Sequence, residues 1–96
     1  MEITMKEVRE EIDLLDRELV LLLARRQKCI EMAAFVKKDK DLVVDEKRID
    51  EVLTKVSSFG KTCGLSDHFS IPLWKTLIDL SIEHETQEID KMNAIN

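Results

Sequence analysis

The sequence predicts an all-α fold of three helices, the first long, the second short and the third of medium length. Its 96 residues are 44% hydrophobic and 36% charged, but include only two glycines, one proline, one tryptophan and three phenylalanines. Sheet proteins usually contain more β-branched, aromatic and turn-forming residues, so this balance favours a helical bundle. No internal repeat or linker interrupts the sequence, and we expect residues 1–96 to form one small helical domain.

The first helix is expected to span about residues 5–38. Between Arg9 and Lys37 the sequence contains neither glycine nor proline, and its apolar residues recur at helical spacing. Thr4 is a suitable N-cap, and Glu7 would complete a capping box. Such a helix would be roughly 50 Å long, whereas a compact domain of this size is about 26 Å across. The chain alone cannot cover its apolar stripe, so a partner chain is expected.

The second helix is expected to begin after Asp45. The charged segment 38–42 interrupts the apolar period and predicts a short loop. Asp45 is a good N-cap, and apolar residues from Ile49 onward recur at helical spacing. Gly60 and Gly64 bracket the expected fraying end, near residue 59 or 62, and Gly64 is a natural helix terminator.

The start of the third helix is open to two interpretations. Ser66 can cap it, but Pro72 would then lie inside the helix, where a proline removes one backbone hydrogen bond and clashes with the preceding turn. Either the helix begins at Ser70, or it begins at Ser66 and kinks. From Leu73 the apolar period is clear, and the helix is expected to fray near Met92.

The composition also limits the possible partners. A net charge of −5 argues against non-specific binding to nucleic acid or acidic membranes, although local cations can still bind a small anion. The longest apolar run, residues 19–24, is too short to span a bilayer, and the charged start does not resemble a signal peptide. Cys29 is expected to be a small buried residue, and with Cys63, His68 and His84 it matches no zinc spacing. We expect a cytoplasmic protein without metal or cofactor, in which both histidines are incidental.

Three cations on the first helix are candidate ligand-binding residues. Arg26 and Lys37 are eleven residues apart and therefore lie within roughly 20° on one face. Arg9 lies about 100° around the helix from Arg26, so one helix cannot direct all three cations to one point. A second copy of the helix, folded against the first, could.

The other two helices carry four further candidates, each with an ordinary structural explanation. Asp45 can serve only as an N-cap, and Arg48 can pair with Asp45 or Glu51 on the surface. Ser81 and Glu85 are four residues apart and share a face. The Ser81 hydroxyl can instead bond to the carbonyl four residues earlier, and Glu85 can be a solvated acid.

Five segments carry a family resemblance when they are taken in order. They are VREEIDLLDRELVLLLARR, AAFVK, VDEKRIDEVL, GLSDHF and LWKTLIDLSIEHE. Together they are similar to the all-helical chorismate mutases over about residues 5–87, and the pattern IDxxDxxLxxLLxxR after an arginine is the most specific part. The resemblance implies an intertwined homodimer of three-helix chains, with the long first helices packed together. It further implies that Arg9 is supplied by the partner, that Arg26 holds a substrate carboxylate, and that Lys37 contacts a carboxylate and the ether oxygen.

The resemblance extends to the second and third helices, with two departures. Asp45 matches the acid that meets the ring hydroxyl, Arg48 matches an arginine near that site, and Ser81 matches a serine near the ring carboxylate. Ile49 stands where a glutamate usually binds the substrate hydroxyl. An aliphatic residue at this position is similar to the isochorismate pyruvate lyases. Glu85 stands where a glutamine usually donates a hydrogen bond to the ether oxygen. A glutamate at this position resembles the pattern of fungal mutases and of some mutases that act on aminodeoxychorismate.

The implied activity is the rearrangement of chorismate to prephenate, with Lys37, Arg48 and Glu85 as catalytic residues and no cofactor. An ionised Glu85 would repel the charge that develops on the ether oxygen, so this residue must be protonated and activity should fall as pH rises. The alternatives are an isochorismate pyruvate lyase or an aminodeoxychorismate mutase on the same scaffold. A further alternative is a non-catalytic dimerisation or regulatory module. The candidate cations argue against it, because packing alone does not require several cations facing one pocket.

Overall fold

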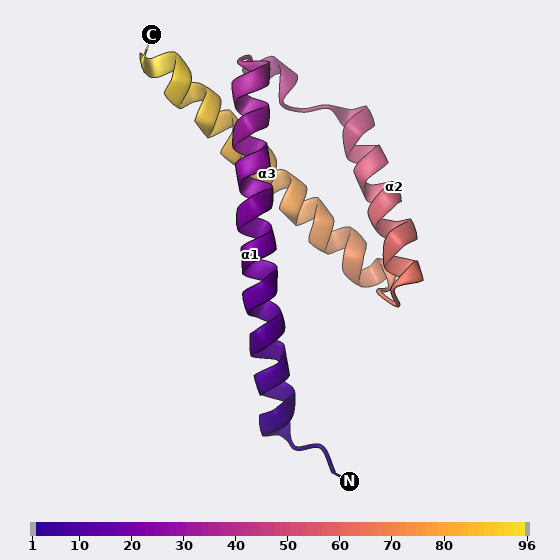
Figure 1. Ribbon diagram of the computed structural model, residues 1–96. Coiled ribbons are helices and arrows are strands. Elements are labelled where there is room, and N and C mark those ends of the chain that lie inside the picture. Colours follow the sequence, from indigo (N-terminus) through magenta and orange to yellow (C-terminus); the bar gives the residue numbers. More distant parts are fainter. Residues whose placement is uncertain (1, 96) are drawn as a thin grey trace.

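The computed structural model describes residues 2–95, and these form helices without any strand. The long helix α1 (Met5–Lys37) is followed by a single 3₁₀ turn, η1 (Lys40–Leu42). Helices α2 (Glu46–Thr62) and α3 (Asp67–Ile95) complete the chain (Figure 1). The predicted all-α fold of three helices is confirmed, although α3 is nearly as long as α1.

Local hydrogen bonds fix both ends of α1. The Thr4 hydroxyl accepts from the Glu7 amide at 3.3 Å, and the Glu7 carboxylate accepts from the Thr4 amide at 3.0 Å. This reciprocal pair is the expected capping box. At the other end Lys38 adopts a left-handed conformation with φ 62°, and its amide donates to the Ala34 carbonyl at 2.9 Å. The helix therefore ends one residue before the expected limit.

The connection from α1 to α2 is short, and its caps come from aspartates. The Asp39 carboxylate accepts from the Asp41 amide at 2.9 Å, so the segment predicted to be a loop contains one turn of 3₁₀ helix. Asp45 caps α2 as predicted, accepting from the Arg48 amide at 3.0 Å. The helix ends at Thr62, between Gly60 and Gly64, as predicted. Gly60 is buried, and an added Cβ there would lie 3.2 Å from the Leu65 carbonyl oxygen.

The structure decides between the two predicted starts of α3. The Ser66 carbonyl accepts from the Ser70 amide at 3.0 Å, so the helix begins directly after Ser66. Pro72 therefore lies inside the helix, which continues through it without interruption. The expectation that α3 frays near Met92 is wrong, because the helix continues to Ile95.

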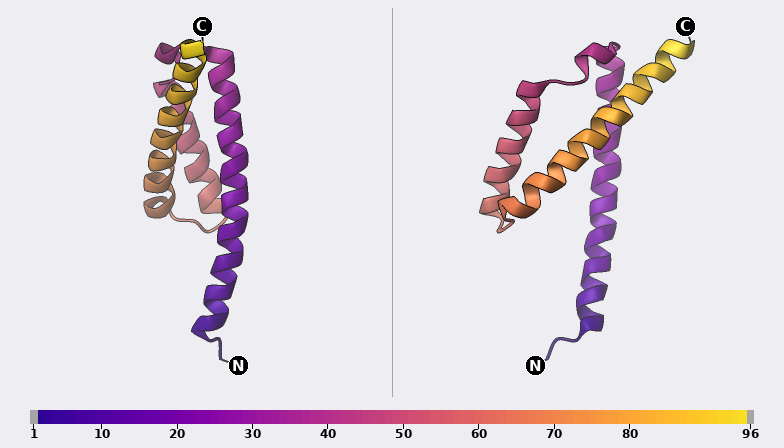
Figure 2. Two further views of the ribbon diagram at one scale, coloured as in Figure 1. Left: turned by 90° about the vertical axis from the view of Figure 1, so that its left-hand side faces the viewer. Right: turned by 180° about the vertical axis from the view of Figure 1, so that it is seen from behind.

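The third helix packs against both of the others and organises the small core. It starts at the tight turn that ends α2, packs against α2, and then runs away from it across α1 (Figures 1 and 2). Ala34, Val43 and Ile89 form the buried cluster, and Ile82 and Met92 pack against it. The core thus lies near the C-terminal end of α1, where α3 and the α1–α2 connection meet.

The N-terminal two thirds of α1 extends beyond this core. The molecule measures 63 × 27 × 15 Å, and α1 projects past the other helices (Figure 2). Every residue from 2 to 25 is exposed, including Leu19 at 54% and Leu22 at 55%. Cys29 is also exposed, so the expectation that it is buried is wrong: nothing in the described part of the chain covers that side of α1. Despite this exposure, none of the described helices is long and apolar enough to cross a membrane.

Gly64 provides a test of the turn between α2 and α3. It adopts φ +85°, with nothing within 4 Å of an added Cβ, so the cost of a side chain there comes from backbone strain alone. We expect Gly64→Ala to lower the free energy of unfolding by about 1–2 kcal/mol. Gly64→Asn should cost less, because asparagine tolerates this conformation better. Urea unfolding at one protein concentration would measure both, and an alanine variant as stable as the unmodified protein would contradict the assignment.

Candidate functional site

A cavity of about 410 Å³ lies between α1, the start of α2 and α3. Its volume is within the range of small-molecule sites. Isoleucine, valine and alanine side chains form most of its wall. Its polar lining consists of Arg26, Lys37, Asp45, Arg48, Ser81 and Glu85. Six of the seven residues proposed from the sequence are thus brought together around one cavity.

Arg26 and Ser81 connect α1 to α3 at one end of this cavity. Arg26 Nη1 donates a hydrogen bond to Ser81 Oγ, and Ser81 Oγ donates to the Leu77 carbonyl at 2.7 Å. The local role considered for Ser81 is therefore present, but the same hydroxyl also holds the arginine. Burial lowers the pKa of Arg26, and the nearby Cys29 partly offsets this shift. An arginine nevertheless remains charged in proteins, so Arg26 presents a half-buried cation.

Lys37 and Glu85 form a second connection between the same helices. Lys37 Nζ lies 3.0 Å from Glu85 Oε1, and the two side chains are 32% and 6% exposed. Glu85 is therefore a buried acid, and the solvated role considered for it is wrong. Apart from this ion pair, no donor among the described residues makes a hydrogen bond to Oε1. A buried carboxylate with so few partners is uncommon and fits a site that a ligand completes.

The start of α2 contributes the remaining polar groups. Asp45 uses Oδ1 to cap the helix, so its carboxylate is held at the cavity by the fold itself. The Arg48 guanidinium lies 3.7 Å from Glu51 Oε2, and its side chain is 58% exposed. Its ordinary surface pairing is therefore weak and easily exchanged. Ile49 lies on the wall of the cavity and offers it no hydrogen bond.

Arg9 is the one candidate that does not reach the cavity. It lies on the exposed N-terminal part of α1, seventeen residues before Arg26. Along a helix this separation is about 25 Å. The Arg9 of the same chain therefore cannot contact a ligand held by Arg26, and a contribution from Arg9 requires a second chain.

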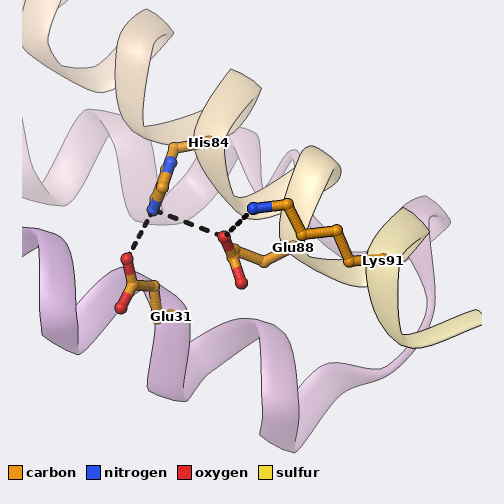
Figure 3. A network of polar contacts seen from close by, with 4 residues as sticks. All are labelled: Glu31, His84, Glu88 and Lys91. Atoms are coloured by element: carbon orange, nitrogen blue, oxygen red, sulfur yellow. Dashed lines mark hydrogen bonds and ion pairs between the residues drawn. The ribbon is translucent and has the colours of Figure 1, made fainter.

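The sequence analysis missed a polar cluster beside this site. His84, expected to be incidental, places Nε2 2.7 Å from Glu31 Oε2 and 3.9 Å from Glu88 Oε1 (Figure 3). The hydrogen bond with His84 is the main cause that lowers the pKa of the Glu31 carboxyl. His84 also lines a smaller cavity of about 220 Å³, which shares Arg26 and Ser81 with the larger one. The four-residue spacing of His84 and Glu88 could have indicated that they share a helix face, but the contact of His84 with Glu31 of α1 depends on the fold.

The larger cavity is suited to a small anion with an apolar body. Its lining holds three cations and two carboxylates, whereas the whole chain carries a net charge of −5. Arginine binds carboxylates through paired hydrogen bonds, and lysine supplies a compact charge. Neither cysteine nor histidine lines this cavity. The arrangement therefore favours chemistry by positioning and electrostatics over covalent catalysis.

Comparison with known proteins identifies one family. Residues 8–86 match the family described as Chorismate mutase type II. The matched segment includes Arg9 and all six polar residues of the larger cavity. No curated protein and no solved structure matches the chain.

Proposed function

The chain belongs to the chorismate mutase type II family, and from this premise we propose that it converts chorismate to prephenate in the larger cavity. Membership supports a chorismate mutase-type isomerase at the level of the family. The observation that carries the specific proposal is the meeting of Arg26, Lys37 and Arg48 with Ser81 and Glu85 around one apolar-walled cavity.

The proposed reaction requires no nucleophile. Chorismate folds so that its enolpyruvyl side chain lies over the ring, the ether C–O bond breaks, and a C–C bond forms within the same molecule. The site must select this folded conformer and stabilise the negative charge that develops on the ether oxygen. Both tasks need fixed, preorganised charges in a site from which water is largely excluded.

Arg26 and Lys37 are the proposed carboxylate ligands. In the structure Ser81 and Glu85 hold these cations in place across the cavity. A substrate carboxylate at Arg26 would offer two acceptors where Ser81 offers one, and Ser81 could then donate to the ring carboxylate. Lys37 would contact the other carboxylate and the ether oxygen, an interaction that strengthens as the C–O bond breaks.

Glu85 is proposed to act as a neutral hydrogen-bond donor to the ether oxygen. An ionised carboxylate can only accept hydrogen bonds and would repel the developing charge. Once the substrate carboxylate draws Lys37 away, a buried and unpaired Glu85 would favour its uncharged form. The ion pair with Lys37 would thus belong to the resting state, and a protonated Glu85 to catalysis.

Asp45 and Arg48 are proposed to hold the ring hydroxyl end of the substrate. Because Asp45 caps α2 through Oδ1, its Oδ2 can accept a hydrogen bond from the hydroxyl. The weakly engaged Arg48 can turn from Glu51 toward a substrate carboxylate. The neighbouring wall at Ile49 is apolar, so Asp45 replaces the acceptor that Ile49 lacks.

A homodimer is proposed to complete the site. The exposed apolar residues on the N-terminal part of α1 form the face that a second α1 would cover. Packing the two long helices together would carry Arg9 of one chain toward the cavity of the other, which the same chain cannot do. Each site would then hold four cations, one of them supplied in trans.

Two other substrates are supported by particular residues. Ile49 favours isochorismate with a lyase reaction, because the wall offers no partner to a hydroxyl there. Glu85 favours an amino-substituted chorismate, whose cationic group a carboxylate can bind. A non-catalytic dimerisation module is disfavoured, because packing alone does not require this set of cations.

Product identification with a matched arginine pair tests the proposal. We expect the purified protein to release prephenate from chorismate, and Arg26→Ala to lower kcat/KM at least about 100-fold, because it removes a preorganised donor. Arg25→Ala is the control, since Arg25 is exposed and does not line the cavity. Release of pyruvate from isochorismate would reassign the reaction to the lyase. An equal loss of kcat/KM in the Arg26 and Arg25 variants would show that the cavity is not the active site.

The role of Glu85 predicts a pH dependence. Between about pH 5 and pH 8, the range of ordinary activity profiles, kcat for chorismate should fall as pH rises, because an ionised Glu85 cannot donate a hydrogen bond. Glu85→Gln keeps a donor that does not titrate, so its kcat should vary much less across this range. Stopped-flow or continuous assays of both proteins provide the comparison. An unchanged profile in the glutamine variant would exclude Glu85 as the titrating donor.

Complementation tests the shared site. Arg9→Ala and Arg26→Ala homodimers should both be inactive, and both should have twice the 11.2 kDa mass of one chain. A heterodimer of the two variants, isolated through different affinity tags, retains one site with both arginines and should recover about half of the activity by the symmetry of the dimer. A heterodimer as inactive as its parents would show that Arg9 does not act across the interface.

A further inference from the structure

Three potential metal ligands from two helices converge at the cluster that contains His84. Glu31 comes from α1, and His84 and Glu88 come from α3. One ligand atom of each lies within 4.8 Å of the other two (Figure 3). We propose that these side chains bind a divalent transition-metal ion, such as Zn²⁺, which clamps α1 to α3. The proposal is independent of the reaction proposed above.

The spacing of the ligand atoms suits this class of ion. Zinc binds imidazole nitrogen and carboxylate oxygen at about 2.0–2.2 Å, so the ligands of a tetrahedral site lie roughly 3.3–3.5 Å apart. His84 Nε2 lies 2.7 Å from Glu31 Oε2 and 3.9 Å from Glu88 Oε1, on either side of that value. Small rotations of the two glutamates, both partly exposed, would equalise the distances. Water would occupy the fourth position.

The backbone already presents two of the ligands together. His84 and Glu88 are one helical turn apart, so both point to the same side of α3. Glu31 reaches this pair from α1. The 2.7 Å between Glu31 Oε2 and His84 Nε2 is shorter than the separation of two ligands that share one ion. An ion would therefore replace the direct hydrogen bond by two coordination bonds rather than require a new arrangement of helices.

Charge and ligand type select the ion. Two carboxylates face two ammonium groups: Lys91 Nζ lies 3.1 Å from Glu88 Oε1, and the charge of Lys28 acts on Glu31, whose carboxylate also pairs with the Gln27 side chain. The Lys91 side chain is 71% exposed and can turn into solvent, which leaves the carboxylates to the ion. An imidazole ligand favours Zn²⁺, Co²⁺ or Ni²⁺, whereas Mg²⁺ prefers oxygen ligands and retains its water.

The place of the cluster assigns the ion a structural role. None of the three ligands lines the larger cavity. His84 directly precedes Glu85, and Glu31 lies between Arg26 and Lys37 on α1. An ion here would thus fix the two helices that carry the candidate site without touching a ligand in the cavity.

Cobalt and zinc titrations of the purified protein test the proposal. One Co²⁺ per chain should produce visible absorption bands of a nitrogen and oxygen site, and Zn²⁺ should displace it. His84→Ala and Glu88→Gln should each weaken binding at least about tenfold, by comparison with losses of that size at outer-shell partners. His68→Ala is the matched control, because His68 is the other histidine of the chain and lies outside the cluster. Lys91→Ala should strengthen metal binding, because it removes the ammonium group that competes with the ion for Glu88.

The two exposed cysteines are the main competing ligands. The titrations are therefore repeated with Cys29→Ser and Cys63→Ser together, and binding should persist. Circular dichroism of each variant shows whether the helices are retained, and Glu88→Gln serves if His84→Ala does not fold. Absence of stoichiometric binding at millimolar Co²⁺ and Zn²⁺, loss of binding with the cysteines, or equal affinity in the His84 and His68 variants would overturn the proposal.

Discussion

Polar connections between α1 and α3 are the interactions on which the rest of the structure depends. The apolar core of one chain is small, and it lies at the C-terminal end of α1. Along the same contact, Arg26 bonds to Ser81 and Lys37 pairs with Glu85. These four groups are also part of the polar lining of the larger cavity. The side chains that join the helices are therefore those that the proposed ligand would engage. Its carboxylates would pair with Arg26 and Lys37, and Glu85 would be left without its partner Lys37.

The length of α1 is the second constraint. The part of α1 from Arg26 onward contacts the remainder of the described chain, and the part before it exposes leucine and valine side chains. A large exposed apolar patch usually marks an interface. The exposed part of α1 also carries Arg9, about 25 Å along the helix from Arg26. The uncovered apolar surface and Arg9 thus lie on the same element, and the proposed second copy of the chain would engage both.

Sequence reasoning recovered what depends on local spacing. The caps at Thr4 and Asp45 follow from side chains that bond within three residues. The shared face of Arg26 and Lys37 follows from the helical period. The role of His84 could not be predicted, because its partner Glu31 is 53 residues away and their contact depends on how α1 and α3 cross. The close approach of Gly60 to the backbone of Leu65 could not be predicted for a similar reason, because it depends on how the chain turns after α2.

In the proposed complex the two carboxylates of the ligand replace Ser81 as the partner of Arg26 and Glu85 as the partner of Lys37. A crystal structure of the protein with bound prephenate tests this most directly. The account predicts both carboxylates between α1 and α3, with Arg26 and Lys37 turned from their present partners toward the ligand, and Arg9 of a second chain beside it. Prephenate bound elsewhere, or bound in this cavity with both present pairs intact, would contradict the account.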